Sequence, residues 1–184
     1  MVVEAAGFDV VFVETVGVGQ SEITVANMVD TFLLLTLARS GDSLQGIKKG
    51  VLELADVIAV NKADGEYVRT AAAAAQELSG ALHLMAARDD GWVTPVLTCS
   101  AAERIDLDTV WDQLRAHRSH LDRTGQLAEH RRRQDVRWMW ATIDDRLLTR
   151  FRARVKDRVA AIEEQVRNAT ITPTKAAEDL LGDS

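Results

Sequence analysis

A short run of β-branched and aromatic residues, Val10 to Val13, passes directly into an acidic residue and two nearby glycines. The run is too short for a helix and too apolar for a surface strand, so it predicts a buried strand of a parallel sheet. Ligands of such sheets lie beyond the carboxyl ends of the strands, where Glu14 stands. Gly17 and Gly19 allow positive φ or close approach of the backbone to a ligand. An ordinary strand with a glycine turn is the alternative interpretation.

Strand and helix patterns alternate over the first two thirds of the chain. Three further apolar runs predict strands, and segments with apolar residues at helical spacing separate them. This alternation predicts an α/β fold built on a parallel sheet. The expected strands are 31–37, 56–60 and 95–98, and the expected helices are 21–30, 44–55, 66–78 and 107–121, with Gly80 as the stop signal of the third helix.

The composition is that of a globular protein, with 47% hydrophobic and 27% charged residues. A single cysteine, Cys99, excludes a disulfide framework and a clustered-cysteine zinc site, and it fits a reducing compartment. No apolar stretch reaches the length that crosses a membrane, and the first residues lack the pattern of a signal peptide. These features predict a cytoplasmic protein with no membrane partner.

The charge changes sign along the chain. Residues 1–112 carry 7 Lys/Arg against 17 Asp/Glu, a net charge of −10, whereas residues 113–184 carry 15 against 11, a net charge of +4. The acidic first part argues against general nucleic-acid binding, and the mixed charges of the second part are typical of a solvated helix surface. We therefore expect two regions, residues 1–123 and 124–184, and no nucleic-acid partner.

The tetrad Asn61-Lys62-Ala63-Asp64 follows the third predicted strand and carries the strongest chemical signal. A carboxylate at a strand end can accept the N1–H and N2–H hydrogens of guanine together, whereas adenine would leave it desolvated and unpaired. The Asn amide would brace neighbouring loops, and the Lys stem would pack along the purine and ribose. Backbone N–H groups after the next strand, at Ser100 and Ala101, could meet the purine carbonyl. The alternative interpretation is a polar turn in which Asp64 caps a helix.

Several segments together resemble one family of GTP-binding proteins. They are Glu14–Glu22, Gly41–Gly50, Asn61–Asp64, Ser100–Ala101 and Gln134–Trp140. On these motifs the chain resembles the second half of the MeaB/ArgK family of G proteins. These are P-loop GTPases that act as chaperones of the adenosylcobalamin-dependent methylmalonyl-CoA mutase, and older labels call them kinases of a lysine/arginine/ornithine transport system. The resemblance implies a P-loop NTPase-like sheet, GTP or GDP with Mg²⁺ as cofactors, and the mutase and a second copy of the chain as partners.

Roles for individual positions also follow from the resemblance. Glu14 and Gly17 are similar to the family's switch II residues, with Glu14 facing Mg²⁺ through a water molecule. Asp42, Gln45 and Lys48 lie in a loop similar to the additional switch that communicates with the mutase. The residues that match the family's guanine-recognition motifs are Asn61, Lys62, Asp64, Ser100, Ala101 and Ala102.

The family's phosphate-binding loop, G-x-x-x-x-G-K-[ST], is absent from this sequence. In the family that loop precedes the segment where Met1 stands, so we expect a truncated reading frame or a fragment with an incomplete sheet. Phosphoryl transfer depends on positioning and electrostatic stabilisation that the loop supplies. We therefore expect weak GTP binding at best and no turnover by the isolated chain. A module that only dimerises or docks on the mutase is the alternative.

The tail has apolar residues at every third or fourth position between residues 136 and 166, which predicts one long helix or a closely spaced pair. Trp138, Met139 and Trp140 add a large apolar surface near its start. Packing on the chain's own sheet is one interpretation, and a subunit interface is the other. The resemblance favours the interface, because the family dimerises through C-terminal helices. Thr172 and Pro173 predict the start of a last helix.

Two further expectations concern solvent exposure. In P-loop GTPases a central strand lies beside the strand that ends in the switch II acid, so without it the strand at residues 10–13 would have an unpaired apolar edge. The side chains expected nearer to solvent for that reason are Phe12, Leu33, Leu35 and Ile58. The four histidines show no metal-ligand pattern and are expected at the surface; they are His83, His117, His120 and His130.

Overall fold

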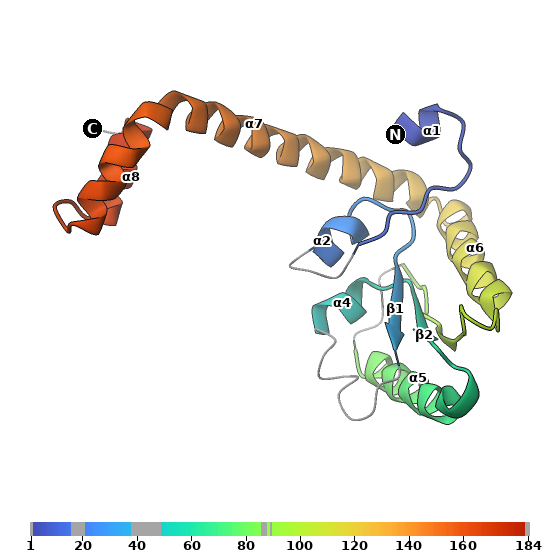
Figure 1. The fold of residues 1–184 in the computed structure, drawn as a ribbon. Coiled ribbons are helices and arrows are strands. Elements are labelled where there is room, and N and C mark those ends of the chain that lie inside the picture. The colour runs from blue at the N-terminus through green and yellow to red at the C-terminus, as the bar shows by residue number, and fades with distance from the viewer. Residues whose placement is uncertain (1, 16–20, 38–48, 86–87, 89, 183–184) are drawn as a thin grey trace. The chain divides into compact units, whose positions relative to one another are not determined.

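The computed structural model describes residues 2–15, 21–37, 49–85, 88 and 90–182. The chain divides into two compact units, Met1–Gln134 and Asp135–Ser184. A three-stranded parallel sheet with helices forms the first unit, and the described part of the second unit consists of helices (Figure 1). The α/β class predicted from the alternation of patterns is therefore confirmed.

The elements of the first unit follow one another as helix and strand. They are α1 (Val2–Ala5), α2 (Ser21–Ala26), β1 (Leu33–Leu37), α4 (Lys49–Leu54), β2 (Val57–Asn61), the 3₁₀ helix η1 (Gly65–Tyr67), α5 (Val68–His83), β3 (Val96–Thr98) and α6 (Leu107–Arg123). Helix α7 (Gln126–Arg167) begins in the first unit and continues into the second, where α8 (Pro173–Leu181) follows. Three of the four predicted strands are present.

Strand β2 is the centre of the sheet, because it pairs in parallel with β1 on one side and β3 on the other. Val57, Ile58, Ala59 and Val60 are all 0% exposed. Both faces of the strand are covered, since Ile58 and Val60 pack in one apolar cluster while Ala59 packs in another with Val110 of α6. The expectation that Ile58 would lie near solvent is therefore wrong.

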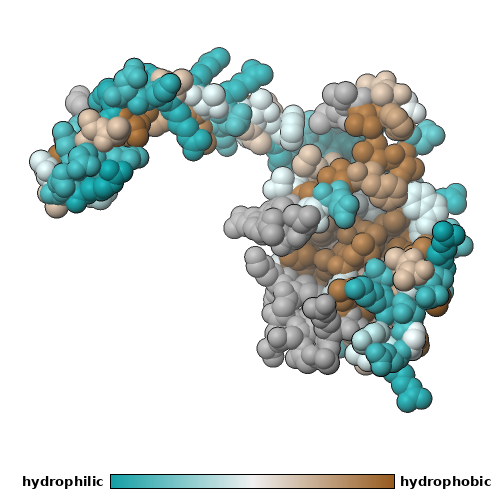
Figure 2. Space-filling model, in the orientation of Figure 1, coloured by the Kyte–Doolittle hydropathy of each residue, from teal (hydrophilic) through white to brown (hydrophobic). Residues whose placement is uncertain are grey.

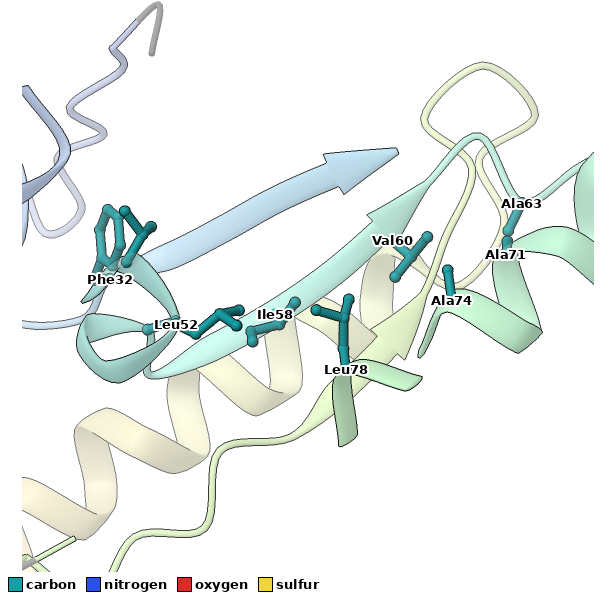
Figure 3. Packing of buried hydrophobic residues seen from close by; sticks show 10 residues of the cluster. Phe32, Leu52, Ile58, Val60, Ala63, Ala71, Ala74 and Leu78 are labelled. Carbon is teal, nitrogen blue, oxygen red and sulfur yellow. The ribbon is translucent and has the colours of Figure 1, made fainter. Parts of the chain in front are cut away.

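The larger apolar cluster joins α4 and α5 to the sheet (Figure 3). The alanine run of α5 contributes Ala71 and Ala74, whose small side chains let the helix approach β2 closely. Leu78 and the partly buried Leu82 extend the contact along the same helix. Helix α5 thus runs past Gly80 to His83, and the predicted stop is wrong, because packing of Leu82 outweighs the roughly 1 kcal/mol that an interior glycine costs.

The first apolar run does not form a strand. Residues 10–13 have no helix or strand assignment and pair with no strand among the described residues. Phe12 is 78% exposed and Leu35 of β1 is 59% exposed, as expected for both, while Leu33 is half-buried. Figure 2 shows a broad hydrophobic area on the first unit. A strand needs a hydrogen-bonded neighbour, and residues 10–13 have none within the part of the chain that the structure describes.

Three histidines are less exposed than the sequence suggests: His120 is half-buried, and the other two have partners far away in sequence. His117 of α6 is 2% exposed, so its predicted surface position is wrong. Its Nδ1 atom lies 2.9 Å from the hydroxyl of Thr31, which precedes β1. His130 is half-buried at the start of α7, with Nε2 3.1 Å from the carbonyl of Val29. Thr31 is 86 positions from His117, and Val29 is 101 positions from His130. No local sequence pattern predicts contacts over such separations.

Helix α7 is one continuous helix of 42 residues rather than a closely spaced pair. Its exposed apolar side chains include Trp138 and Trp140. Helix α8 begins as predicted, with Thr172 accepting a hydrogen bond from the backbone N–H of Lys175 and Pro173 in its first turn. None of the helices in the described part of the chain combines the length and the apolar character needed to cross a membrane.

Candidate functional site

The carboxyl ends of β2 and β3 bring the two sequence motifs together. Asn61 is the last residue of β2, and Ser100 lies two positions beyond β3. The backbone carbonyl of Cys99 accepts a hydrogen bond of 2.9 Å from the N–H of Ala63, and the N–H of Cys99 donates to Val60 at 2.9 Å. Parallel pairing thus continues into both loops and places them side by side.

The side chain of Asn61 joins the two loops. Its amide oxygen accepts hydrogen bonds from the backbone N–H of Lys62 at 2.8 Å and from that of Ala101 at 3.0 Å. The thiol of Cys99 also lies 3.9 Å from this oxygen. Burial raises the pKa of the Cys99 thiol, so the group stays protonated and takes part as a weak donor. One amide therefore fixes the end of β2 against the loop that follows β3.

Asp64 stands at the N-cap position of η1 but does not act as a cap, because its side chain accepts no capping hydrogen bond there. Its Oδ2 instead accepts a hydrogen bond from the hydroxyl of Ser100, which is fully buried. The same hydroxyl accepts from the backbone N–H of Glu103 at 3.1 Å. The interpretation of Asp64 as an ordinary helix cap does not fit this geometry. Sequence reasoning placed both residues in the site but missed the bond between them.

Lys62 has a left-handed backbone, with φ of 62°, and an exposed side chain. This conformation is uncommon outside glycine and is kept where the surroundings enforce it. The bond from the Lys62 N–H to the amide of Asn61 supplies one such constraint. The backbone of Lys62 is therefore held in this conformation two positions before Asp64.

The loop after β3 is closed by a short antiparallel bridge. Ser100 and Ile105 exchange two backbone hydrogen bonds of 3.0 Å each. Ala101 and Ala102 lie exposed within the closed loop, and Arg104 adopts a left-handed conformation with φ of 56°. The loop thus presents small exposed residues directly after Ser100, whose hydroxyl donates to the Asp64 carboxylate.

The switch residues predicted from the sequence are not gathered with these loops in the described part of the chain. Glu14 is exposed in the segment 10–15, which has no helix or strand assignment. Gly17, Asp42, Gln45 and Lys48 lie outside the described residues. Among the described residues, no group of three or more His, Cys, Asp or Glu side chains is arranged to hold a metal ion.

The model of the family described as "Methylmalonyl Co-A mutase-associated GTPase MeaB" matches residues 1–156. The chain belongs to the MeaB family. A probable GTPase of Mycobacterium tuberculosis is 51% identical to this MeaB-family chain over 183 residues, which cover 98% of the chain and 54% of that protein. GTPase ArgK of Escherichia coli is 46% identical over 145 residues, which cover 79% of the chain and 44% of that protein.

A solved structure described as an LAO/AO transport system kinase has the same fold as the MeaB-family chain. The two superpose with a TM-score of 0.75 at 39% sequence identity, over 98% of this chain and 58% of that chain. The incomplete P-loop NTPase-like sheet followed by C-terminal helices is therefore the correct description of the fold. The MeaB-family chain spans about half the length of the relatives that it matches.

Proposed function

We propose that this chain carries the guanine-recognising part of a MeaB/ArgK-type GTPase. The observation that supports the proposal most is the pairing of Asp64 with the buried hydroxyl of Ser100. A carboxylate held in one orientation at a strand end can discriminate between purines, because a mismatched base leaves it desolvated without a donor. The brace from Asn61 to Ala101 keeps the second loop within reach of the same ligand.

In this proposal Asp64 accepts the N1–H and N2–H hydrogens of guanine. The backbone N–H of Ala102 donates to the purine carbonyl on the other side, because that of Ala101 is bound to the amide oxygen of Asn61. The stem of Lys62 packs along the ring and the ribose. Adenine offers an acceptor where guanine offers the N1–H donor, so it would face the carboxylate with a repulsive contact. The carboxyl edge of the sheet at β2 and β3 should therefore bind guanine more tightly than adenine.

The phosphate side of the nucleotide belongs to residues that the described site does not include. Glu14 and Gly17 would face Mg²⁺ and the γ-phosphate, and Mg²⁺ would neutralise the charge that develops during phosphoryl transfer. The sequence holds no phosphate-binding loop with its lysine and hydroxyl. We therefore assign weak guanine-nucleotide binding and essentially no GTP turnover to the isolated chain.

The proposed partners follow from the family. The family description names methylmalonyl-CoA mutase, and we assign this chain to a chaperone of that adenosylcobalamin-dependent enzyme, with Asp42, Gln45 and Lys48 in the loop that communicates with it. The long helix supports a homodimer, because Trp138 and Trp140 are 52% and 58% exposed. The functional division is a nucleotide region, residues 1–123, and a dimerisation arm, residues 124–184.

Nucleotide preference tests the central proposal. We expect the isolated chain to bind a fluorescent guanosine diphosphate weakly but measurably more tightly than the adenosine analogue, in fluorescence-anisotropy titrations. Asp64→Ala should remove that preference. Asp108→Ala, which changes an exposed carboxylate of α6, is the matched control and should leave the preference unchanged. Equal affinity of the unmodified chain for both nucleotides would contradict the proposal.

A second candidate is a module that dimerises or docks on a mutase and binds no nucleotide. The absence of a phosphate-binding loop from the sequence favours it for the isolated chain. Light scattering at micromolar concentration tests dimerisation independently of nucleotide binding, because a dimer is expected whether or not nucleotide binds. A well-behaved monomer would contradict the assignment of the arm.

A further inference from the structure

A second polar cluster lies at the amino edge of the sheet, at the opposite end of β2 from the loops that carry Asn61 and Asp64. It joins four parts of the chain: the residues before β1, the residue before β2, the segment before β3, and helix α6. The proposed nucleotide site uses none of these side chains. The main members are Asp56, Arg88, Asp90, Trp92, His117 and His120.

Asp56 and Arg88 form the centre of the cluster. One carboxylate oxygen of Asp56 accepts the backbone N–H of Phe32 at 2.7 Å, and the other accepts the guanidinium of Arg88 at 2.8 Å. The same guanidinium donates to Asp90 at 2.8 Å and to the carbonyl of Ala55 at 3.2 Å. One arginine therefore attaches the segment before β3 to the start of β2, beside Thr94, whose hydroxyl donates to the same Ala55 carbonyl at 3.0 Å.

Trp92 provides the second attachment of that segment. Its indole N–H donates to the backbone carbonyl of Asp56 at 2.8 Å, and its backbone N–H donates to Asp90 at 2.9 Å. The indole ring meets the imidazole of His117 edge-on, with 5.0 Å between the ring centres, and that of His120 at 5.5 Å. Trp92 therefore covers His117 on the side of the segment.

His117 is the least satisfied member. Its Nδ1 pairs with the hydroxyl of Thr31 at 2.9 Å, while its Nε2 lies 3.4 Å from the carboxylate of Asp56. This Nε2 is the buried side-chain atom that, within the described residues, makes no hydrogen bond. The oxygen nearest to it already accepts from Arg88. An additional proton on His117 would bring a second cation to an oxygen that Arg88 occupies.

The surroundings of His117 oppose its charged form. Burial lowers the pKa of His117, and the charges of Arg88 and His120 act in the same direction. The carboxylates of Asp56 and Asp90 act in the opposite direction but do not compensate for burial. A neutral imidazole is thus the form that the closed cluster accommodates. Arg88 and Asp90 remain paired over the same range, because their mutual bonds raise the pKa of the guanidinium and lower that of the carboxyl despite partial burial.

We propose that His117 and Asp56 form an acid-released latch, in which protonation of the imidazole detaches the side chains of Arg88 and Trp92 from the amino edge of the sheet. These side chains are the part that moves, because the side chains of Arg88 and Asp90 are 29% and 20% exposed while His117 and Asp56 are buried. Opening lets water reach the imidazolium without separating β1 from β2.

The test measures the exposure of Trp92 as the pH falls. In a chain whose other, exposed tryptophans Trp111, Trp138 and Trp140 are replaced by phenylalanine, acrylamide quenching reports Trp92 alone. We expect quenching to rise severalfold in a single step with its midpoint below about 6.5, the ordinary value for histidine. Circular dichroism in the far ultraviolet should stay constant through that step. A coincident loss of helix signal, or no step before the protein unfolds, would overturn the latch.

Two variants identify the group that titrates. His117→Gln keeps a neutral donor beside Asp56 and should abolish the step, whereas His120→Gln, the matched control on the same helix, should retain it. Thr31→Val removes the hydroxyl that donates to Nδ1 of the neutral imidazole, so it should move the midpoint to higher pH. Retention of the step in His117→Gln, or an unmoved midpoint in Thr31→Val, would show that another group is responsible. If His117→Gln does not fold, the shift in Thr31→Val decides alone.

Discussion

Two four-residue apolar runs of this chain are both rich in valine, but only one of them forms a strand. Residues 57–60 form the core of β2 and are 0% exposed, whereas residues 10–13 form no strand and are between 42% and 78% exposed. Both runs are dominated by valine, so strand propensity does not separate them. The difference is the neighbour: β2 lies between β1 and β3, and residues 10–13 pair with no described strand. Pairing, rather than composition, made one of them a strand.

The largest effect should come from truncating one residue in each run. Ile58→Ala removes a fully buried side chain and leaves a cavity, so it should lower the free energy of unfolding by about 2–5 kcal/mol. Phe12→Ala changes a side chain that is 78% exposed and should stay within about 0.5 kcal/mol. Urea unfolding followed by circular dichroism measures both. Similar losses from the two variants would break the comparison.

A neighbouring strand supplied by a separate polypeptide should allow residues 10–13 to form a paired strand, as residues 57–60 do. The part of the mycobacterial relative that this chain does not match, produced separately, should raise the melting temperature by about 5–10 °C at a hundredfold excess over its dissociation constant. It should also strengthen guanine-nucleotide binding. Leu35→Asp, on the exposed side of β1, is the control that should prevent the gain. An unaltered melting curve would show that the edge of β1 needs no partner.

A charged anchor between the two runs should have a smaller effect. Asp30 lies between α2 and β1 and accepts hydrogen bonds from Arg131 at 2.8 and 2.6 Å and from Arg118 at 2.8 Å. Burial raises the pKa of Asp30, but these arginines outweigh it and hold the pKa below its ordinary value. We expect Asp30→Asn to lose about 2 kcal/mol of stability at neutral pH.

The pH dependence of that loss checks its origin. Because the folded-state pKa of Asp30 is depressed, its contribution is complete above the ordinary value near 3.8 and is lost as the pH falls through the folded value. The stability difference between Asp30→Asn and the unmodified chain should therefore shrink at acid pH in urea titrations. A difference that is constant from neutral pH to pH 3 would mean that the ion pairs contribute nothing.

The smallest effect should come from Ser100→Ala, beyond the carboxyl end of β3. The variant leaves Asp64 and the N–H of Glu103 without the hydroxyl that links them, at a cost of about 1 kcal/mol, because both groups can reach water. Ser100→Thr keeps the hydroxyl and should recover most of the loss. Urea unfolding of the three proteins gives the comparison. A larger loss than that of Asp30→Asn would mean that the site loops also support the sheet.

Sequence patterns were most reliable where the deciding contacts are local. The start of α8 follows from Thr172 and Pro173, and the fully covered β2 follows from an uninterrupted apolar run. The positions of Asn61 and Ser100 at adjacent strand ends follow from parallel topology alone. The remainder of the fold required partners that no local pattern reveals.

Three errors have that common cause. His117 is buried because its two ring nitrogens lie beside Asp56 and Thr31 at the amino edge of the sheet, and both residues are far away in sequence. Helix α5 continues past Gly80 because Leu82 packs on the core. Residues 10–13 remain outside the sheet because a strand pattern states what a segment can do and not whether a neighbour is present. The bond from Ser100 to Asp64 was missed for the same reason.

The links between the two loops of the candidate site also have a consequence for the order of folding. Asn61 and Ala101 are 40 positions apart, and Asp64 and Ser100 are 36 positions apart. Closing a chain segment of that length costs entropy before the contact repays it, so long-range links form after local structure. Helix α5 must form and β2 must align with β3 before either link can exist. A ligand that needs both loops can therefore bind only protein molecules in which β2 and β3 are already aligned. It cannot bind the earlier folding intermediates.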